Sequence, residues 1–215
     1  MEPILLTPII LILLVSNLRL LNTSRMQVMI FSVAVQGFVV GMLPLVLHSG
    51  RLHLPILFIT LVTSVIKGLI LPRLLYRART QAGVLREVEP FVGPTPSVFI
   101  GLLLLGISYG ISRPLLTTLP EQVKWIVILS LSMVFMGLFI IISRKKALTQ
   151  VIGYLTLENG IYAFGASLAV DHPLIVELGV LLDVWVGVFI MGIAIYHINR
   201  EFDHIDTDKL SLLKE

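Results

Sequence analysis

Successive apolar runs of about 20 residues dominate the sequence, and short segments between them carry most of the charges. A helix rises 1.5 Å per residue, so about 20 apolar residues cross the roughly 30 Å hydrocarbon core of a bilayer. Apolar residues make up 56% of the chain and charged residues 13%, whereas a soluble domain has about 45–50% and 25%. The sequence therefore predicts an all-α, polytopic membrane helix bundle.

Seven runs are long enough to be transmembrane helices. They cover residues 3–21, 28–47, 54–75, 97–116, 123–143, 147–170 and 173–198. The first run lacks the basic start and the small-residue cleavage site of a signal peptide, so we expect it to remain in the mature protein.

The distribution of Lys and Arg predicts the orientation of these helices. Twelve of the sixteen basic residues follow the first, third, fifth and seventh runs. Cytoplasmic loops hold the excess of basic residues, so we expect the N-terminus outside, the C-terminus in the cytoplasm and a multi-pass location in the inner (cytoplasmic) membrane. The same rule explains the net charge of +3, and nucleic-acid binding is not expected.

The longest connection, 76–96, is rich in Pro and Gly and divides the chain. We expect an N-terminal three-helix part at 1–76, a cytoplasmic loop at 77–96, a four-helix part at 97–198 and a cytoplasmic tail at 199–215. The tail alternates charged and apolar residues, which fits either a docking segment or a frayed solvated end.

Four ionisable side chains fall inside the apolar runs: Lys67, Glu158, Glu177 and Asp183. An ionisable group at the centre of a bilayer costs about 2.5–3.5 kcal/mol, so each is expected to face the bundle interior, a partner or a wet cavity. We interpret all four as candidates for a proton relay.

Each candidate also has a structural interpretation. Lys67 lies roughly 9 Å from the cytoplasmic end of its run, so it could snorkel to the interface or form a structural ion pair. Glu158 and Asp183 lie roughly 16 and 21 Å from that end, too deep to snorkel, and the alternative for them is structural hydrogen bonding. Glu177, near the start of the last run, could instead favour the positive end of the helix dipole.

Polar neighbours accompany these charges: Gln36, Tyr154, Asn159 and Tyr162. Two of them, the tyrosines, lie four residues on either side of Glu158 and share its helix face. Gln36 stands beside Gly37 and Gly41, whose spacing allows another helix to approach closely. We expect a hydrogen-bonded polar strip around Glu158.

The sequence contains no cysteine, so the chain itself can hold no disulfide, thiolate zinc site or iron–sulfur cluster. The five histidines lie at run ends or in loops, which argues against haem between helices. Nucleotide-binding and hydrolase motifs are missing as well. We expect no catalytic centre, metal or cofactor in this chain.

Several stretches resemble the hydrogenase 4 component E (HyfE) family. They are QVIGYLTLENG at 150–160, VELGVLLD at 176–183, SVIKGLILP at 64–72 and LSLLK at 210–214. The resemblance covers nearly the whole chain. Members are membrane subunits of group 4 NiFe-hydrogenase and formate hydrogenlyase-type complexes, which are related to complex I.

The last three runs also resemble the NuoK subunit of complex I and the MrpC subunit of cation/proton antiporters. Asn159 matches the Asn after that family's first membrane glutamate, and Asp183 falls where its second glutamate lies. The first glutamate aligns with Leu155, and this chain places Glu158 one turn later on about the same helix face.

The resemblance implies a non-catalytic subunit of a membrane-bound hydrogenase complex. It places the NiFe centre and the iron–sulfur clusters in peripheral partner subunits, and antiporter-like membrane subunits beside this chain. Lys67, Glu158 and Asp183 would then belong to a string of charged groups that couples hydrogen metabolism to proton or sodium movement. Two alternatives remain: a scaffold that joins the antiporter-like subunits to the complex, and a cation/proton antiporter component without hydrogenase.

Overall fold

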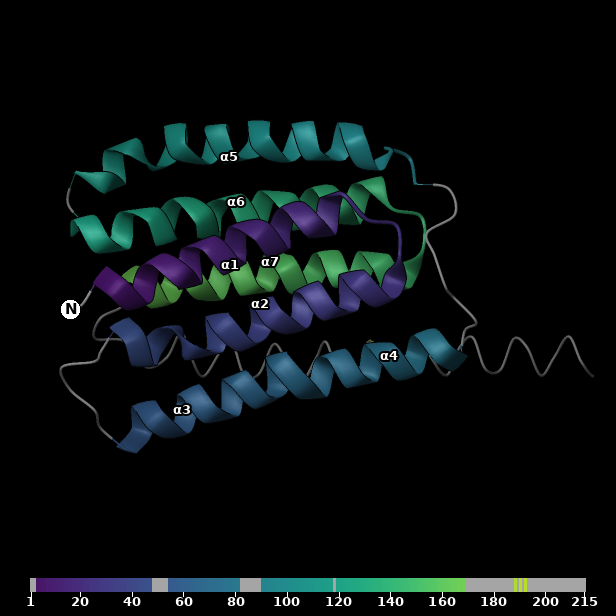
Figure 1. The fold of residues 1–215 in the computed structure, drawn as a ribbon, viewed down its shortest axis with the longest axis horizontal. Coiled ribbons are helices and arrows are strands. Elements are labelled where there is room, and N and C mark those ends of the chain that lie inside the picture. Colours follow the sequence, from purple (N-terminus) through teal and green to yellow (C-terminus); the bar gives the residue numbers. More distant parts are fainter. Residues whose placement is uncertain are drawn as a thin grey trace, which may run out of the picture.

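The computed structural model describes residues 3–47, 54–81, 90–117 and 119–168, together with 188, 190 and 192. In these residues all regular structure is helical, and the helices lie side by side as a bundle (Figure 1). The elements are α1 (Pro3–Leu21), α2 (Met26–Leu47), α3 (Leu54–Val65), the π-helical segment η1 (Ile66–Ile70), α4 (Leu71–Gln81), α5 (Pro94–Leu116), α6 (Glu121–Ser143) and α7 (Ala147–Leu168). The all-α prediction is confirmed.

Four helices in the described part of the chain are long and apolar enough to cross a membrane, with α3, η1 and α4 together forming one of them. The apolar part of α1 is shorter, over Leu6–Leu21. Helix α7 has 22 residues, but polar residues such as Gln150 and Asn159 lower its hydropathy. The expected span at 173–198 lies outside the described residues apart from 188, 190 and 192, so the seven spans remain a prediction.

The expected third helix ends at 75, but α4 continues to Gln81. Helix α4 is amphipathic: Leu75 and Ala78 are buried, whereas Arg73 and Arg77 are exposed. A prediction based on hydropathy alone ends among these arginines, at 75, although a helix with one apolar face continues. At the other end of the connection, α5 begins with a proline in its first turn, where the missing N–H costs nothing. The expected loop at 77–96 is therefore helical at both ends.

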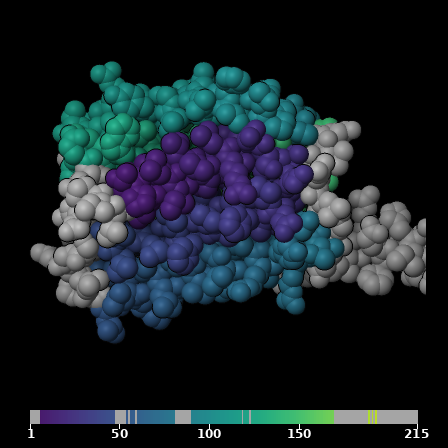
Figure 2. Space-filling model, viewed as in Figure 1, coloured from purple at the N-terminus to yellow at the C-terminus, as the bar shows by residue number. Residues whose placement is uncertain are grey.

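Helix α2 occupies the middle of the bundle and packs against α1, α7 and the α3–η1–α4 helix. Helices α6 and α7 approach each other at glycines: a Cβ at Gly137 would lie 2.5 Å from the backbone nitrogen of Leu157, and one at Gly160 would lie 2.7 Å from the Ser130 carbonyl oxygen. Figure 2 shows one face of the molecule, with α1 and α2 between α5 at one edge and α3–α4 at the other. Glycine contacts of this kind are typical of helices packed in a membrane.

Helices α1, α4 and α6 end at the same end of the bundle (Figure 1), and basic residues lie at or near the end of each of these helices in the sequence. Arg144 is buried and donates from Nη2 to the Leu21 carbonyl oxygen over 3.4 Å. Lys145 Nζ lies 5.0 Å from the centroid of the Phe91 ring. These contacts agree with the expectation that the basic segments share one side, while the compartment they face remains a prediction.

A buried lysine–glutamate pair as the candidate functional site

Lys67 lies within the π-helical segment η1, which interrupts the regular helix between α3 and α4. The backbone N–H of Leu71 donates to the carbonyl of Ile66, five residues earlier. A π-turn of this kind shifts the hydrogen-bond pattern by one residue and is frequent at functional sites. Sequence reasoning gave no signal for it, since the segment is as apolar as the helices around it.

Glycines in α2 bring its backbone against η1 and α3. A Cβ at Gly37 would lie 2.6 Å from the Lys67 carbonyl oxygen, and one at Gly41 would lie 2.5 Å from Ser64 Oγ. These distances are too short for any side chain larger than hydrogen, so the close approach expected from the glycine spacing is confirmed. The structure adds that the partner is the segment carrying Lys67.

The Lys67 amine forms an ion pair with Glu158 of α7, donating to Oε1. Each of the two side chains is only 2% exposed. Lys67 Nζ also lies 5.6 Å from the centroid of the Tyr162 ring, a distance at which a cation is attracted to the aromatic face. The snorkelling interpretation of Lys67 is therefore wrong, because the amine is held inside the bundle.

The other candidates from the sequence have different outcomes. Asn159 and Tyr162 follow Glu158 in α7, and both are buried. Tyr154 is half-buried and packs against an apolar cluster. Glu177 and Asp183 lie outside the described residues. The structure thus brings together Lys67, Glu158 and Tyr162, and it leaves the rest of the expected string of charges untested.

A second polar contact lies between α1 and α2. Gln36 Nε2 donates to Asn17 Oδ1 over 2.8 Å, and both residues are almost completely buried. Gln36 is among the polar residues expected from the sequence, but its partner Asn17 is not. An amide side chain inside an apolar run, like a charged one, is expected to face a polar partner within the bundle. This criterion could have identified Asn17 from the sequence.

Three buried hydroxyl groups lie along α3 in the turns before Lys67. Thr60, Thr63 and Ser64 are all buried, and their spacing places them on the same helix face as Lys67. In the described part of the chain, none of these three hydroxyls has a hydrogen-bond partner. A hydroxyl can both donate and accept a hydrogen bond, so this face offers polar groups on the approach to the ion pair.

Comparison with known proteins identifies relatives of the chain. It is 31% identical to the uncharacterized protein Rv0085 of Mycobacterium tuberculosis, over 84% of this chain and 82% of that protein. It is also 28% identical to hydrogenase-4 component E of Escherichia coli K12, over 69% of this chain and 68% of that protein. The chain belongs to the hydrogenase-4 component E-like family.

The family resemblance found in the sequence is thus confirmed. Hydrogenase-4 component E of Shigella flexneri matches the chain as well as the Escherichia coli protein does, at 28% identity over 69% of the chain. Neither a family model nor a solved structure matches.

In the structure of this hydrogenase-4 component E-like chain, Leu155 belongs to an apolar cluster, and Glu158 is the acid that meets Lys67. The likeness to NuoK and MrpC, in which Leu155 takes the place of the first membrane glutamate, remains a prediction. Among the described residues no group of three or more His, Cys, Asp or Glu could hold a metal ion.

Proposed function

We propose that this chain is a non-catalytic membrane subunit of a hydrogenase complex and that its Lys67–Glu158 pair takes part in proton or sodium translocation. The printed name of the hydrogenase-4 relatives and the apolar helices of the chain support membership of such a complex. The observation that carries the translocation role is an ion pair buried in an apolar bundle. The expected partners are antiporter-like membrane subunits and peripheral subunits that hold the NiFe centre and the iron–sulfur clusters.

Energetics favour a functional interpretation of the pair. Removing two charges from water costs several kcal/mol per ion, and a well-packed apolar pair is often as stable as a buried salt bridge or more so. Packing alone therefore gives no reason to keep Lys67 and Glu158. A functional reason exists, because an ionisable group inside a membrane commonly marks an ion or proton path.

The chemistry of the pair permits proton transfer. The Glu158 carboxyl can hold or release a proton, and the amine of Lys67 lies directly beside it. The long lysine stem lets the amine approach or leave the carboxyl without movement of the backbone. Movement of Lys67 would accompany proton transfer at Glu158, and the hydroxyls of α3 provide polar groups along which a proton can approach.

The test is to replace Glu158 with Gln and Lys67 with Met in the native complex. We expect both variants to assemble, as judged by affinity purification of the complex, but to lose proton movement into inverted vesicles during hydrogen production. The matched control replaces Lys124 with Met, since Lys124 pairs with Glu121 at an exposed position. Normal proton movement in Glu158→Gln would contradict the translocation role.

A scaffold role is the second candidate, and it is favoured by α5. Only 17% of the apolar stretch of α5 is buried, and Phe99, Leu103 and Ile111 are exposed on it. If the variants of Lys67 and Glu158, together with Asp183→Asn, assemble and translocate normally, the scaffold function remains. A purified native complex without any NiFe subunit would instead indicate a cation/proton antiporter.

A further inference from the structure

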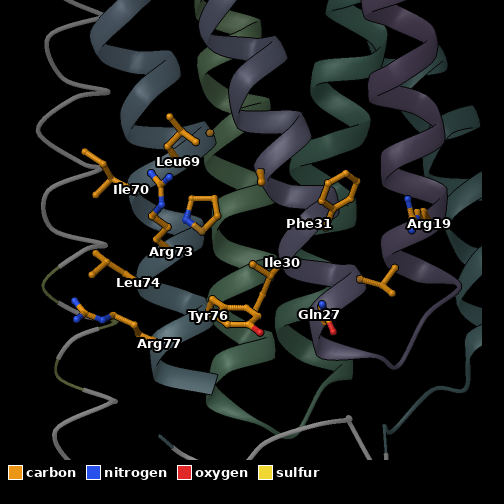
Figure 3. Close-up of a pocket in the computed structure, with 14 residues that line it drawn as sticks. Arg19, Gln27, Ile30, Phe31, Leu69, Ile70, Arg73, Leu74, Tyr76 and Arg77 are labelled. Carbon is orange, nitrogen blue, oxygen red and sulfur yellow. The ribbon is translucent and has the colours of Figure 1, made fainter. Parts of the chain in front are cut away.

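A groove of about 860 Å³ lies on the outside of the bundle, between α2 and the η1–α4 segment. Ile30 and Phe31 of α2 form one wall, and Leu69, Ile70 and Leu74 form the other. Figure 3 shows Arg73 and Arg77 on one side of this groove and Arg19 on the other. The groove therefore combines an apolar body with three arginines.

The positive charges of the groove are not balanced by acids in the described part of the chain. Arg19, Arg73 and Arg77 are all exposed, and the residues that line the groove include no acid. The described residues include two acids, Glu121 and Glu158, and each forms an ion pair with a lysine outside the groove. The guanidinium of Arg19 lies 5.7 Å from the ring of Phe31, which holds its charge over the apolar wall.

The groove changes character along its length. Along the helix, the lining passes from Arg77 and Arg73 to Ile70, Leu69 and Gly68. Gly68 and Arg77 are nine positions apart, which is roughly 13 Å of helix. The arginines belong to α1 and α4, which end at the same end of the bundle (Figure 1), so they lie at the membrane surface, and the apolar part points toward the bilayer centre. An anionic phospholipid has the same order of groups, with a charged phosphate above an acyl chain.

We propose that this groove binds an anionic phospholipid, with its phosphate at Arg19, Arg73 and Arg77 and an acyl chain against α2 and η1–α4. Arginine binds phosphate through paired hydrogen bonds, and basic pockets between transmembrane helices are typical lipid headgroup sites. A zwitterionic lipid carries its own cation and gains less from the three arginines. The proposal depends on insertion of the chain in a membrane and not on a role in a hydrogenase complex.

The position of the groove gives the lipid a structural effect. Its inner end reaches Gly68, the residue after Lys67, so an acyl chain in the groove covers the outer side of the π-turn that carries the ion pair. Lipid binding is therefore expected to stabilise the packing of η1 against α2.

Binding can be measured on the full-length protein purified in detergent. Native mass spectrometry with added dioleoyl phosphatidylglycerol should detect one tightly retained lipid, and dioleoyl phosphatidylcholine should bind at least tenfold more weakly. Arg73→Gln/Arg77→Gln should weaken phosphatidylglycerol binding at least tenfold. The matched control, Arg25→Gln/Arg113→Gln, removes two exposed arginines outside the groove and should bind normally.

Two further measurements distinguish the lipid from its headgroup and from general charge effects. Ala34, which lines the groove, is replaced by Phe to fill the apolar part while all arginines remain, and this variant should also lose binding. Glycerol phosphate at millimolar concentration should not displace the lipid. Equal binding of both lipids, equal loss in the control, normal binding by Ala34→Phe or full displacement by glycerol phosphate would each overturn the proposal.

Discussion

Gly37 of α2 lies directly against the backbone of Lys67, so close that a Cβ on it would come 2.6 Å from the Lys67 carbonyl oxygen and 2.7 Å from the Lys67 Cβ. No side chain separates the two helices at this point. The position of the π-turn, and with it the position of the lysine, therefore depends on the size of a residue in another helix.

Replacing Gly37 with Val should separate α2 from η1 and displace the lysine. Overpacking of a well-filled interior typically costs about 1–3 kcal/mol, so the midpoint of thermal unfolding of the purified protein should fall. Proton movement by the native complex should fall as well. The control is Gly106→Val, because a Cβ at Gly106 meets nothing within 4 Å. Equal destabilisation by both substitutions would show that the close contact at Gly37 is not the cause of the lost stability.

The ion pair allows stability to be separated from function. Lys67→Met alone leaves the Glu158 carboxyl buried without its cation, and breaking a buried pair in this way costs about 3–5 kcal/mol. Adding Glu158→Leu removes the second charge, and we expect the double variant to recover most of the lost stability. Proton movement should stay absent in both variants, since Lys67→Met lacks the amine that pairs with the Glu158 carboxyl and the double variant lacks the carboxyl as well.

Thermal unfolding of the single and double variants and proton movement into vesicles test these expectations together. A double variant as unstable as Lys67→Met would indicate that the pair stabilises the bundle. A double variant that translocates at the normal rate would remove the pair from any proton path.

The contact between Asn17 and Gln36 predicts a coupled pair of substitutions. Gln36→Leu leaves the buried Asn17 amide without its 2.8 Å hydrogen bond, and an unsatisfied buried polar group costs about 1–3 kcal/mol. The double substitution Asn17→Leu/Gln36→Leu should cost less than the sum of the two single ones. Unfolding midpoints of the three variants give the coupling, and simple additivity would mean that the hydrogen bond contributes nothing.

The sequence predicts those features that depend on local composition. The helix over 147–168 follows from its apolar run, and the burial of Glu158 follows from its depth within that run. The ion pair with Lys67 could not be predicted, because the two residues are 91 positions apart and their meeting depends on how α7 and η1 are rotated. The π-turn was missed because a shift of one hydrogen bond leaves hydropathy unchanged.

The orientation of the bundle can be tested because the chain has no cysteine, so one introduced thiol is the single target of a maleimide. Asn22 and Thr117 are exposed and follow α1 and α5, which end at opposite ends of the bundle (Figure 1). The excess of basic residues near Asn22 predicts that this end faces the cytoplasm. In intact cells, a membrane-impermeant maleimide should therefore label Thr117→Cys, and it should label Asn22→Cys only after permeabilisation. The unmodified chain, which should not react, is the control. Labelling of both variants in intact cells would contradict a spanning bundle, and the reverse pattern would invert the orientation.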